Sequence, residues 1–227
     1  GLEIETSSTA LQALTDAVIY LVDYPFEGSE QIASRILAIA SLKDVLSAFQ
    51  AEELPSPAVL ADQVKSDLDQ LQKLQNEDGG FPYWRRGFES IPFNTIHTAH
   101  ALMRAQQKGY ALPTGMGEGT LTYLREIETH YPYWYSEQTR WTLSAYALYV
   151  RAQWNDADAA KALRLLNEAG LENLSMEAIG WLWQVIEDES ALQEIRQYVN
   201  NHVVETAGAA NFTTQYTDQT YLLLSSN

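Results

Sequence analysis

The segment from Tyr24 to Gln31, YPFEGSEQ, contains the residues whose types and spacing point most clearly to a chemical site. A Tyr-Pro turn and Gly28 lead into Ser29, Glu30 and Gln31, and a long run of apolar residues at helical spacing follows. Two interpretations are open. In one, Ser29 caps the helix and the acidic residue lies beside its positive end. In the other, Gly28 occupies the position of a reactive residue.

His97 and His100 form a second candidate group, because residues three apart lie on roughly one face of a helix. A zinc site needs a third and a fourth ligand, and no spacing of the HExxH kind supplies them. The chain has no cysteine, which excludes thiolate ligands and cysteine nucleophiles together. We therefore interpret the two histidines as residues at the core edge that make ordinary hydrogen bonds. We expect no metal ion and no cofactor.

Apolar residues recur at helical spacing almost throughout, so the elements that must position these residues are helices. Strand-like alternation is confined to the tail NFTTQYTDQTYLLLSSN, in which Phe212, Tyr216 and Tyr221 lie among β-branched and turn-forming residues. The fold class is therefore all-α, with a short irregular or β-like C-terminal tail. We expect helices near residues 8–22, 29–49, 57–76, 94–109, 118–129, 136–153, 156–169, 175–187 and 190–204.

Short connections with turn-forming residues favour antiparallel helix hairpins. In LPSP, Pro57 is expected in the first turn of a helix. A faint repeat supports stacked hairpins: residues 24–42 and 131–149 both contain Tyr-Pro followed by Ser-Glu-Gln, and Ser136 is expected to cap its helix in the way proposed for Ser29. Repeated hairpins must stack or close to bury their apolar faces. We predict an α/α toroid, a single domain spanning residues 1–227.

Composition narrows the function classes. The net charge is −16 and the 14 Lys and Arg residues are scattered, which excludes a nucleic-acid surface. With 46% hydrophobic residues the chain is globular, and no apolar run is long enough to cross a membrane, so we expect no direct membrane insertion. Gly1 looks like the remnant of an expression tag, so we expect the chain to be a piece excised from a larger multidomain protein. Acidic residues are numerous, but the sequence singles out no glycosidase-type carboxylate pair.

Three collinear segments carry a resemblance to a known family. LQKLQNEDGGFPYW, with its Q-x-x-D-G-G-F pattern, resembles the hairpin corners of terpenoid-cyclase-like toroids, which include the thioester domains of complement proteins and α2-macroglobulins. YPFEGSEQ resembles the thioester segment Y-P-x-x-C-x-E-Q of bacterial α2-macroglobulins without gaps. The segments QNEDGGFPYWRRGFESIPFNTIHTAHALMRAQQKGYALP and ETAGAANFTTQYTDQTYLLLSSN are similar to later parts of that family. The resemblance spans nearly the whole chain, although the chain stops before the family's final helices, so the ring is expected to be incomplete.

The resemblance implies a specific chemistry for the opening segment. In that family a cysteine thiol and a glutamine side chain condense into an internal thioester, because two intervening residues put both groups on one side of a tight turn. Here Gly28 occupies the cysteine position while Glu30 and Gln31 match the family, so no thioester can form. Either the natural protein belongs to a branch without the thioester, or the cysteine was replaced deliberately.

The resemblance also implies which residues surround that turn. Tyr24, Pro25 and Phe26 precede it and are expected to shape the site, as are His97 and His100. In some thioester proteins a histidine catalyses acyl transfer, but its local motif has no clear match here. We therefore expect no catalytic role for either histidine.

The function implied is that of a thioester-type domain of a bacterial α2-macroglobulin-like, broad-range endopeptidase inhibitor, a protease trap. Without the thioester the domain would be a structural and interaction module and not an enzyme. Its partners would be the neighbouring domains of the parent protein and, through the full-length protein, target proteases. The resemblance implies a periplasmic, cell-surface or secreted setting in the bacterial cell envelope. The alternative is a carbohydrate-active or lyase enzyme on an α/α toroid.

Overall fold

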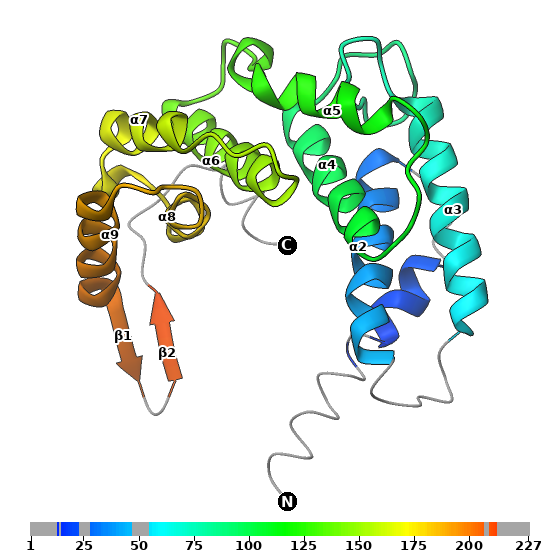
Figure 1. Ribbon diagram of the computed structural model, residues 1–227, viewed down its shortest axis with the longest axis horizontal. Coiled ribbons are helices and arrows are strands. Elements are labelled where there is room, and N and C mark those ends of the chain that lie inside the picture. Colours follow the sequence, from blue (N-terminus) through cyan, green and yellow to red (C-terminus); the bar gives the residue numbers. More distant parts are fainter. Residues whose placement is uncertain (1–12, 14, 23–27, 47–54, 207–208, 213–227) are drawn as a thin grey trace, which may run out of the picture. The chain divides into compact units, whose positions relative to one another are not determined.

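The computed structural model describes residues 13, 15–22, 28–46, 55–206 and 209–212 (Figure 1). The chain divides into two compact units, Gly1–Tyr123 and Leu124–Asn227. Within the described residues the secondary structure is helical apart from one β-hairpin, which confirms the predicted all-α class. No helix in this part of the chain combines the length and the apolar composition needed to cross a membrane.

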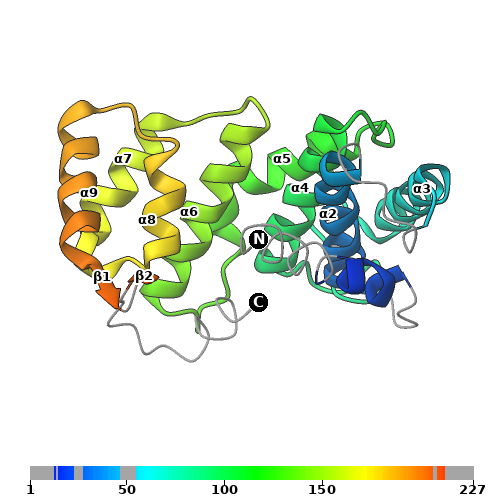
Figure 2. The same ribbon diagram turned by 90° about the horizontal axis from the view of Figure 1, so that it is seen from below.

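The first unit is built around α2 (Ser29–Leu46), which packs against both α3 (Pro57–Leu74) and α4 (Pro92–Gln107), as Figures 1 and 2 show. A helical segment at residues 15–22 precedes α2, and α5 (Met116–Arg125) ends at the boundary between the units. Burial of branched apolar side chains drives this packing. The core includes Ile32, Ile36, Ile39, Leu60, Val64, Leu68, Leu71, Phe81, Ile96, Leu102 and Met103.

A buried ion pair also ties α2 to α3. The Arg35 Nε atom donates to Asp67 Oδ2 at 2.8 Å, and the side chains are only 2% and 0% exposed. The Gln63 amide donates to Asp67 Oδ1 at 2.9 Å, and Arg35 Nη1 donates to the Leu21 carbonyl at 3.0 Å. Because each charged group is hydrogen-bonded, the pair is tolerated in the core, and it fixes how residues 15–22, α2 and α3 meet.

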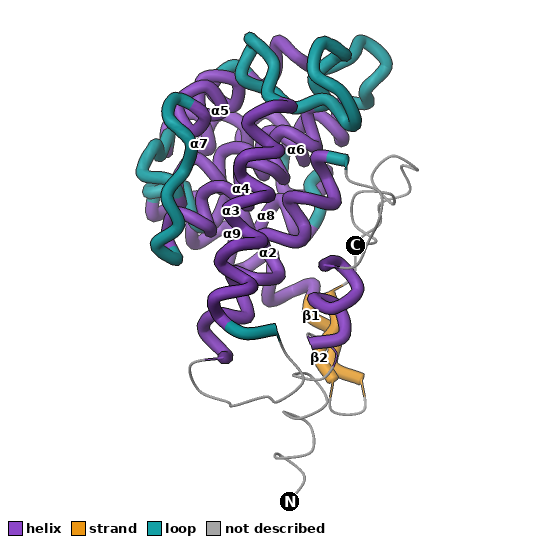
Figure 3. The backbone as a smooth tube through the Cα atoms, turned by 90° about the vertical axis from the view of Figure 1, so that its right-hand side faces the viewer, coloured by secondary structure: helices purple, strands orange, loops and turns teal. Residues whose placement is uncertain are grey.

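The second unit is built around α6 (Glu137–Gln153), which packs against α7 (Ala159–Ala169) and α8 (Met176–Trp183). Next come α9 (Glu189–His202) and an antiparallel hairpin of β1 (Val203–Thr206) and β2 (Ala209–Phe212), shown in Figure 3. In its register Val203 is paired with Phe212. Two short 3₁₀ helices complete the unit, η1 (Ile127–His130) and η2 (Leu171–Asn173). Its core includes Leu148, Leu165, Leu166, Leu174, Ile179, Leu182, Val185, Ile186 and Ile195.

Most predicted helices are confirmed, although several ends differ: α7 begins at Ala159 and not at 156, and α8 ends at Trp183 and not at 187. Residues 8–12, 14 and 47–49 of the predicted helices lie outside the described residues. Pro57 opens α3 as predicted, and α4 begins earlier than predicted, at Pro92, because proline suits the first helical position. The predicted helix 118–129 is divided into α5 and η1 at Glu126, and η1 ends at His130 because Tyr131, the residue before Pro132, is disfavoured in a helix. The last predicted helix ends at His202, where β-branched residues enter the β-hairpin. Phe212 lies in a strand as expected, whereas Tyr216 and Tyr221 lie outside the described residues.

Candidate functional site

The candidate site in the first unit is the N-terminus of α2. The Ile32 amide donates to the Gly28 carbonyl at 3.1 Å, which makes Gly28 the cap and Ser29 the first helical residue. The Gln31 side chain folds back, and its Oε1 atom accepts a hydrogen bond from the Gly28 amide at 3.1 Å. This is the glutamine half of a capping box. The structure therefore brings Gly28 and Gln31 together on the same side of the turn.

The expected capping role of Ser29 is wrong. Ser29 is inside the helix, and its buried hydroxyl accepts a hydrogen bond from Asn94 Nδ2 of α4 at 3.3 Å. The cap position belongs to the residue before it, which has no side chain. Both interpretations of this segment, a helix cap and a reactive position at residue 28, fit this geometry. The contact between Gln31 and Gly28 is ordinary capping, and a cysteine–glutamine condensation requires the same two positions to be adjacent.

Tyr83 covers this turn and was not recognised as a site residue from the sequence. Its backbone carbonyl accepts from the Ser29 amide at 2.8 Å, and its hydroxyl accepts from Gln31 Nε2 at 2.8 Å. A Cβ atom placed on Gly28 would lie 2.6 Å from Gln31 Oε1 and 3.0 Å from the Tyr83 ring. A side chain at position 28 would thus point at the Gln31 carboxamide and would push the end of that flexible side chain aside, in a space bounded by Tyr83. The sequence feature that could have indicated Tyr83 as a site residue is its position two residues after the D-G-G-F turn.

A hydrogen-bonded chain runs from this turn along α2. The Ser34 hydroxyl donates to Glu30 Oε1 at 3.3 Å and lies 2.9 Å from His97 Nε2. A hydroxyl has one proton, so when it goes to the carboxylate, His97 Nε2 must be the donor to Ser34. The His97 ring also stacks on Phe93, with 5.8 Å between centroids.

Burial, and to a lesser extent the charge of His100, lower the pKa of His97 from 6.5 to about 4. Burial, followed by the nearby Arg104, lowers the pKa of His100 to about 4 as well. Both histidines are therefore neutral at pH 7. Among the described contacts, His97 reaches Glu30 only through Ser34, and neither histidine is hydrogen-bonded to Gly28 or Gln31. Tyr24, Pro25 and Phe26, expected to shape the site, lie outside the described residues.

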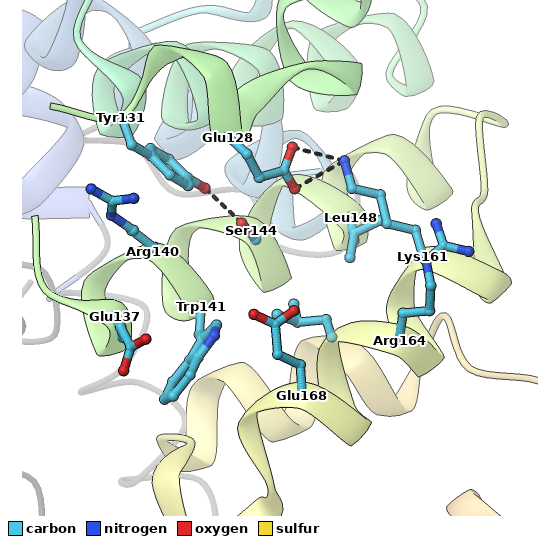
Figure 4. A pocket seen from close by; sticks show the side chains of 11 residues that line it. Glu128, Tyr131, Glu137, Arg140, Trp141, Ser144, Leu148, Lys161, Arg164 and Glu168 are labelled. Carbon is cyan, nitrogen blue, oxygen red and sulfur yellow. Dashed lines mark hydrogen bonds and ion pairs between the residues drawn. The ribbon is translucent and has the colours of Figure 1, made fainter. Parts of the chain in front are cut away.

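The second unit contains a separate polar cavity of about 370 Å³ (Figure 4). Figure 4 shows the Glu168 carboxylate directed into it and Trp141 at its wall. Tyr131 Oη and Ser144 Oγ are 2.8 Å apart, and Lys161 Nζ donates to the Glu128 carboxylate at 2.9 Å. The remaining lining residues are Glu137, Arg140, Leu148, Arg164 and Leu165. Within the described residues, no group of three or more histidine or acidic side chains is placed to hold a metal ion.

Comparison with curated proteins gives three relatives, while no protein-family model matches. The chain is 28% identical over 120 residues to the "Circularly permutated Ras protein 2" of Dictyostelium discoideum, covering 49% of the chain and 3% of that protein. It is 31% identical over 149 residues to an "Alpha-2-macroglobulin homolog" of Yersinia pestis, and the match covers 64% of the chain and 7% of that protein. It is 27% identical over 154 residues to the alpha-2-macroglobulin of Rickettsia conorii, covering 67% and 8%. The chain thus spans less than about a tenth of each relative.

Solved structures point in the same direction. Native alpha-2-macroglobulin from Escherichia coli, solved from domain MG7 to the C-terminus, matches with a TM-score of 0.68 and 19% sequence identity. The match covers 82% of the present chain and 30% of the solved one. Salmonella alpha-2-macroglobulin reacted with methylamine matches with a TM-score of 0.64 and 18% sequence identity, over 83% of the present chain and 12% of the solved one. The chain is a homologue of bacterial alpha-2-macroglobulins. The structural likeness confirms the predicted fold class, an α/α toroid of antiparallel helix hairpins.

Of the two candidate sites, the Gly28–Gln31 turn and the cavity of the second unit, the turn is the one that the similarity to alpha-2-macroglobulins relates to a function. The turn holds the Gln31 carboxamide directly against position 28. Because glycine supplies no nucleophile and the chain has no cysteine, the turn of this chain cannot form a thioester.

Proposed function

We propose that this chain is the thioester-type domain of an alpha-2-macroglobulin-like protease trap, and that it acts as a structural and interaction module without covalent capture. The two units together would form this single domain of a larger parent protein. The observation that carries the proposal is the direction of position 28, whose Cβ would lie 2.6 Å from Gln31 Oε1. A capping box brings the glutamine to the cap in the same way, and a cysteine condensing with the glutamine requires this juxtaposition, so it is the likeness to bacterial alpha-2-macroglobulins that favours the thioester interpretation.

The partners follow from this role. In the parent protein a neighbouring domain would cover the Gly28–Gln31 turn, and target proteases would be held sterically after they cleave a bait segment. Two of the similar Escherichia coli alpha-2-macroglobulin structures are of protein activated by trypsin or by porcine elastase, which makes these the first proteases to test. The setting would be the bacterial periplasm or cell surface, or the protein would be secreted.

Denaturing electrophoresis tests the proposal on the full-length protein. After incubation with trypsin or elastase, we expect protease to co-elute with the native protein, and we expect the complex to separate completely in detergent. A detergent-resistant adduct would contradict steric capture, and a failure to retain protease would contradict the trap itself. Methylamine should leave the intact mass of this chain unchanged, because there is no thioester to open, and an addition of methylamine with loss of ammonia would overturn the assignment.

A carbohydrate-active enzyme is the second candidate, favoured by one observation. The cavity of the second unit combines an aromatic wall, Trp141, with the carboxylates of Glu137 and Glu168, and sugars are held by such mixtures of aromatic and polar groups. Turnover of a polysaccharide by the purified chain, abolished by Glu168→Gln, would support this candidate against the trap. We expect no turnover.

A further inference from the structure

Each end of the Gln31 carboxamide has one hydrogen-bond partner: the Gly28 amide binds its oxygen, and the Tyr83 hydroxyl binds its nitrogen. Gln31 Oε1 accepts from the Gly28 amide at 3.1 Å, and Gln31 Nε2 donates to the Tyr83 hydroxyl at 2.8 Å. A backbone N–H can only donate, so the oxygen of the carboxamide must be the atom that faces Gly28. The nitrogen is thereby assigned to the side of Tyr83. A flip of the planar group would lose the hydrogen bond to the Gly28 amide, whereas the Tyr83 hydroxyl, which can also donate, would still bind the carboxamide.

The loop that carries Tyr83 is held rigidly by its own hydrogen bonds. Asp78 Oδ1 accepts from the Gly80 amide and from the Ser90 hydroxyl, each at 2.9 Å. Asn76 Nδ2 donates to the Phe88 carbonyl at 2.8 Å, which ties the two ends of the loop together. Gly79 has a φ of +84°, and a Cβ there would lie 1.9 Å from the Gly119 carbonyl oxygen. Only glycine fits, so the turn places Tyr83 at a fixed point over α2.

We propose that Tyr83 is the positioning residue of this site: it holds the Gln31 carboxamide with its carbonyl group at position 28 and its nitrogen on the opposite side. This proposal rests on the proposed function. It also gives the D-G-G-F turn a role beyond architecture, because the turn presents the tyrosine that orients the acyl donor.

In Gly28→Cys the Gln31 carboxamide has to shift slightly, because the new Cβ would lie 2.6 Å from its Oε1 atom, and the restored thiol can then react with it in a defined way. The sulfur forms a bond to the Gln31 carbonyl carbon, the C–N bond of the carboxamide breaks, and the nitrogen leaves as ammonia after taking up the thiol proton. The backbone amide of residue 28 donates to the oxygen on which negative charge develops. The departing nitrogen lies against the Tyr83 hydroxyl, so the hydroxyl aligns the bond that breaks.

Hydrogen exchange in the unsubstituted chain tests the positioning directly. Tyr83→Phe removes the hydroxyl and keeps the ring, so we expect the Gln31 carboxamide to become mobile and the Gly28 amide to exchange about fivefold faster, the effect of losing about one net hydrogen bond. Tyr133→Phe is the matched control, because Tyr133 is 93% exposed and lies in the other unit. An unchanged Gly28 exchange rate in Tyr83→Phe would overturn the proposal.

The group transfer is tested in the full-length protein carrying Gly28→Cys. We expect loss of the free thiol, a mass lower by one ammonia, and reactivity with methylamine. Adding Tyr83→Phe should slow thiol loss about tenfold or more, a typical effect of a misplaced reacting group, whereas adding Tyr133→Phe should not. Equal rates in all three variants would refute the role of Tyr83. If Gly28→Cys alone forms no thioester, the assignment of position 28 in the proposed function fails, and the exchange experiment still decides whether Tyr83 orients Gln31.

Discussion

The starts of α2 and α6 have the same three residues, Ser-Glu-Gln, and fold differently. At α6 the serine is the cap: the Ser136 hydroxyl accepts from the Thr139 amide at 3.1 Å, and the contact is local. At α2 the helix begins one residue earlier relative to the shared letters, so Gly28 is the cap and Ser29 is helical.

This one-residue shift changes what the glutamine does. Gln31 is the third helical residue, from which a side chain reaches back to the cap amide, whereas Gln138 is the second and has no hydrogen bond among the described side-chain contacts. Tyr83 and Asn94 then hold the start of α2 through long-range contacts. The same three residues therefore form a local cap in one unit and a site held by tertiary contacts in the other.

The largest expected change in the free energy of unfolding comes from the buried ion pair that joins α2 to α3. Asp67→Asn leaves the buried Arg35 guanidinium without its counter-charge, and we expect a loss of about 3–5 kcal/mol in the free energy of unfolding. The matched change in the second unit is Glu189→Gln, because Glu189 and its partner Arg196 are 78% and 48% exposed, so the loss should be at most about 1 kcal/mol. Urea denaturation followed by circular dichroism measures both. Similar losses would show that α2 is not anchored by the buried pair.

Acid should destabilise the first unit through His97. Its pKa is lowered in the folded state from 6.5 to about 4, so the unfolded state binds more protons between these values. Stability is therefore full above pH 6.5 and falls as the pH drops towards 4, by an amount on the order of 3 kcal/mol.

His97→Gln is the variant that isolates this effect. A glutamine side chain at this position cannot be protonated in this range, so the variant should lose part of the pH dependence of unfolding, while the contribution of His100 remains. Hydrogen exchange at a neutral and at a mildly acidic pH would locate the effect. An acid response equal in the variant and the unsubstituted chain would rule out His97 as its source.

The two glutamines provide a direct test of the shifted helix start. Gln31→Ala removes the contacts to Gly28 and to Tyr83, and we expect a loss of about 1–2 kcal/mol for two hydrogen bonds that are partly buried. Gln138→Ala should change the free energy of unfolding by less than about 0.5 kcal/mol, as substitutions away from buried or hydrogen-bonded groups usually do. Equal effects, measured by the same urea titrations, would mean that the shift has no energetic consequence.

The smallest expected effect is at the cap of α6. Ser136→Ala removes the acceptor for the Thr139 amide and should cost about 1 kcal/mol, while Ser136→Gly should cost only a few tenths of that amount. A thermal melt resolves such differences when the variants are compared under one buffer. If the Ser136→Ala variant were as stable as the unsubstituted chain, the Ser136 cap would not contribute to the stability of α6.

Much of the fold follows from the sequence because helices depend on local signals. Apolar spacing predicted α2 to α9, and Pro57, Ser136 and the glycines of the D-G-G turn predicted several ends and corners. The end of the last helix was missed, since β1 forms only by pairing with β2, and pairing is a contact between segments.

The candidate site was predicted only in part. The spacing of Gly28 and Gln31 predicted that the two lie together, and this geometry is present, although their identity as an inactive thioester site stays a prediction. The role of Tyr83 was missed because 52 residues separate it from Gln31.

The sequence by itself determined that this chain is helical, that it lacks a thiol, and that a glutamine follows the glycine by three residues. Periodicity, composition and turn chemistry are local properties, and reading the chain residue by residue recovers them. Only the tertiary structure decided which residue caps α2, and that a tyrosine from a distant loop holds the glutamine in one orientation. The physical reason is that a hydrogen bond depends on distance and angle in space, which sequence spacing does not specify beyond a turn of helix.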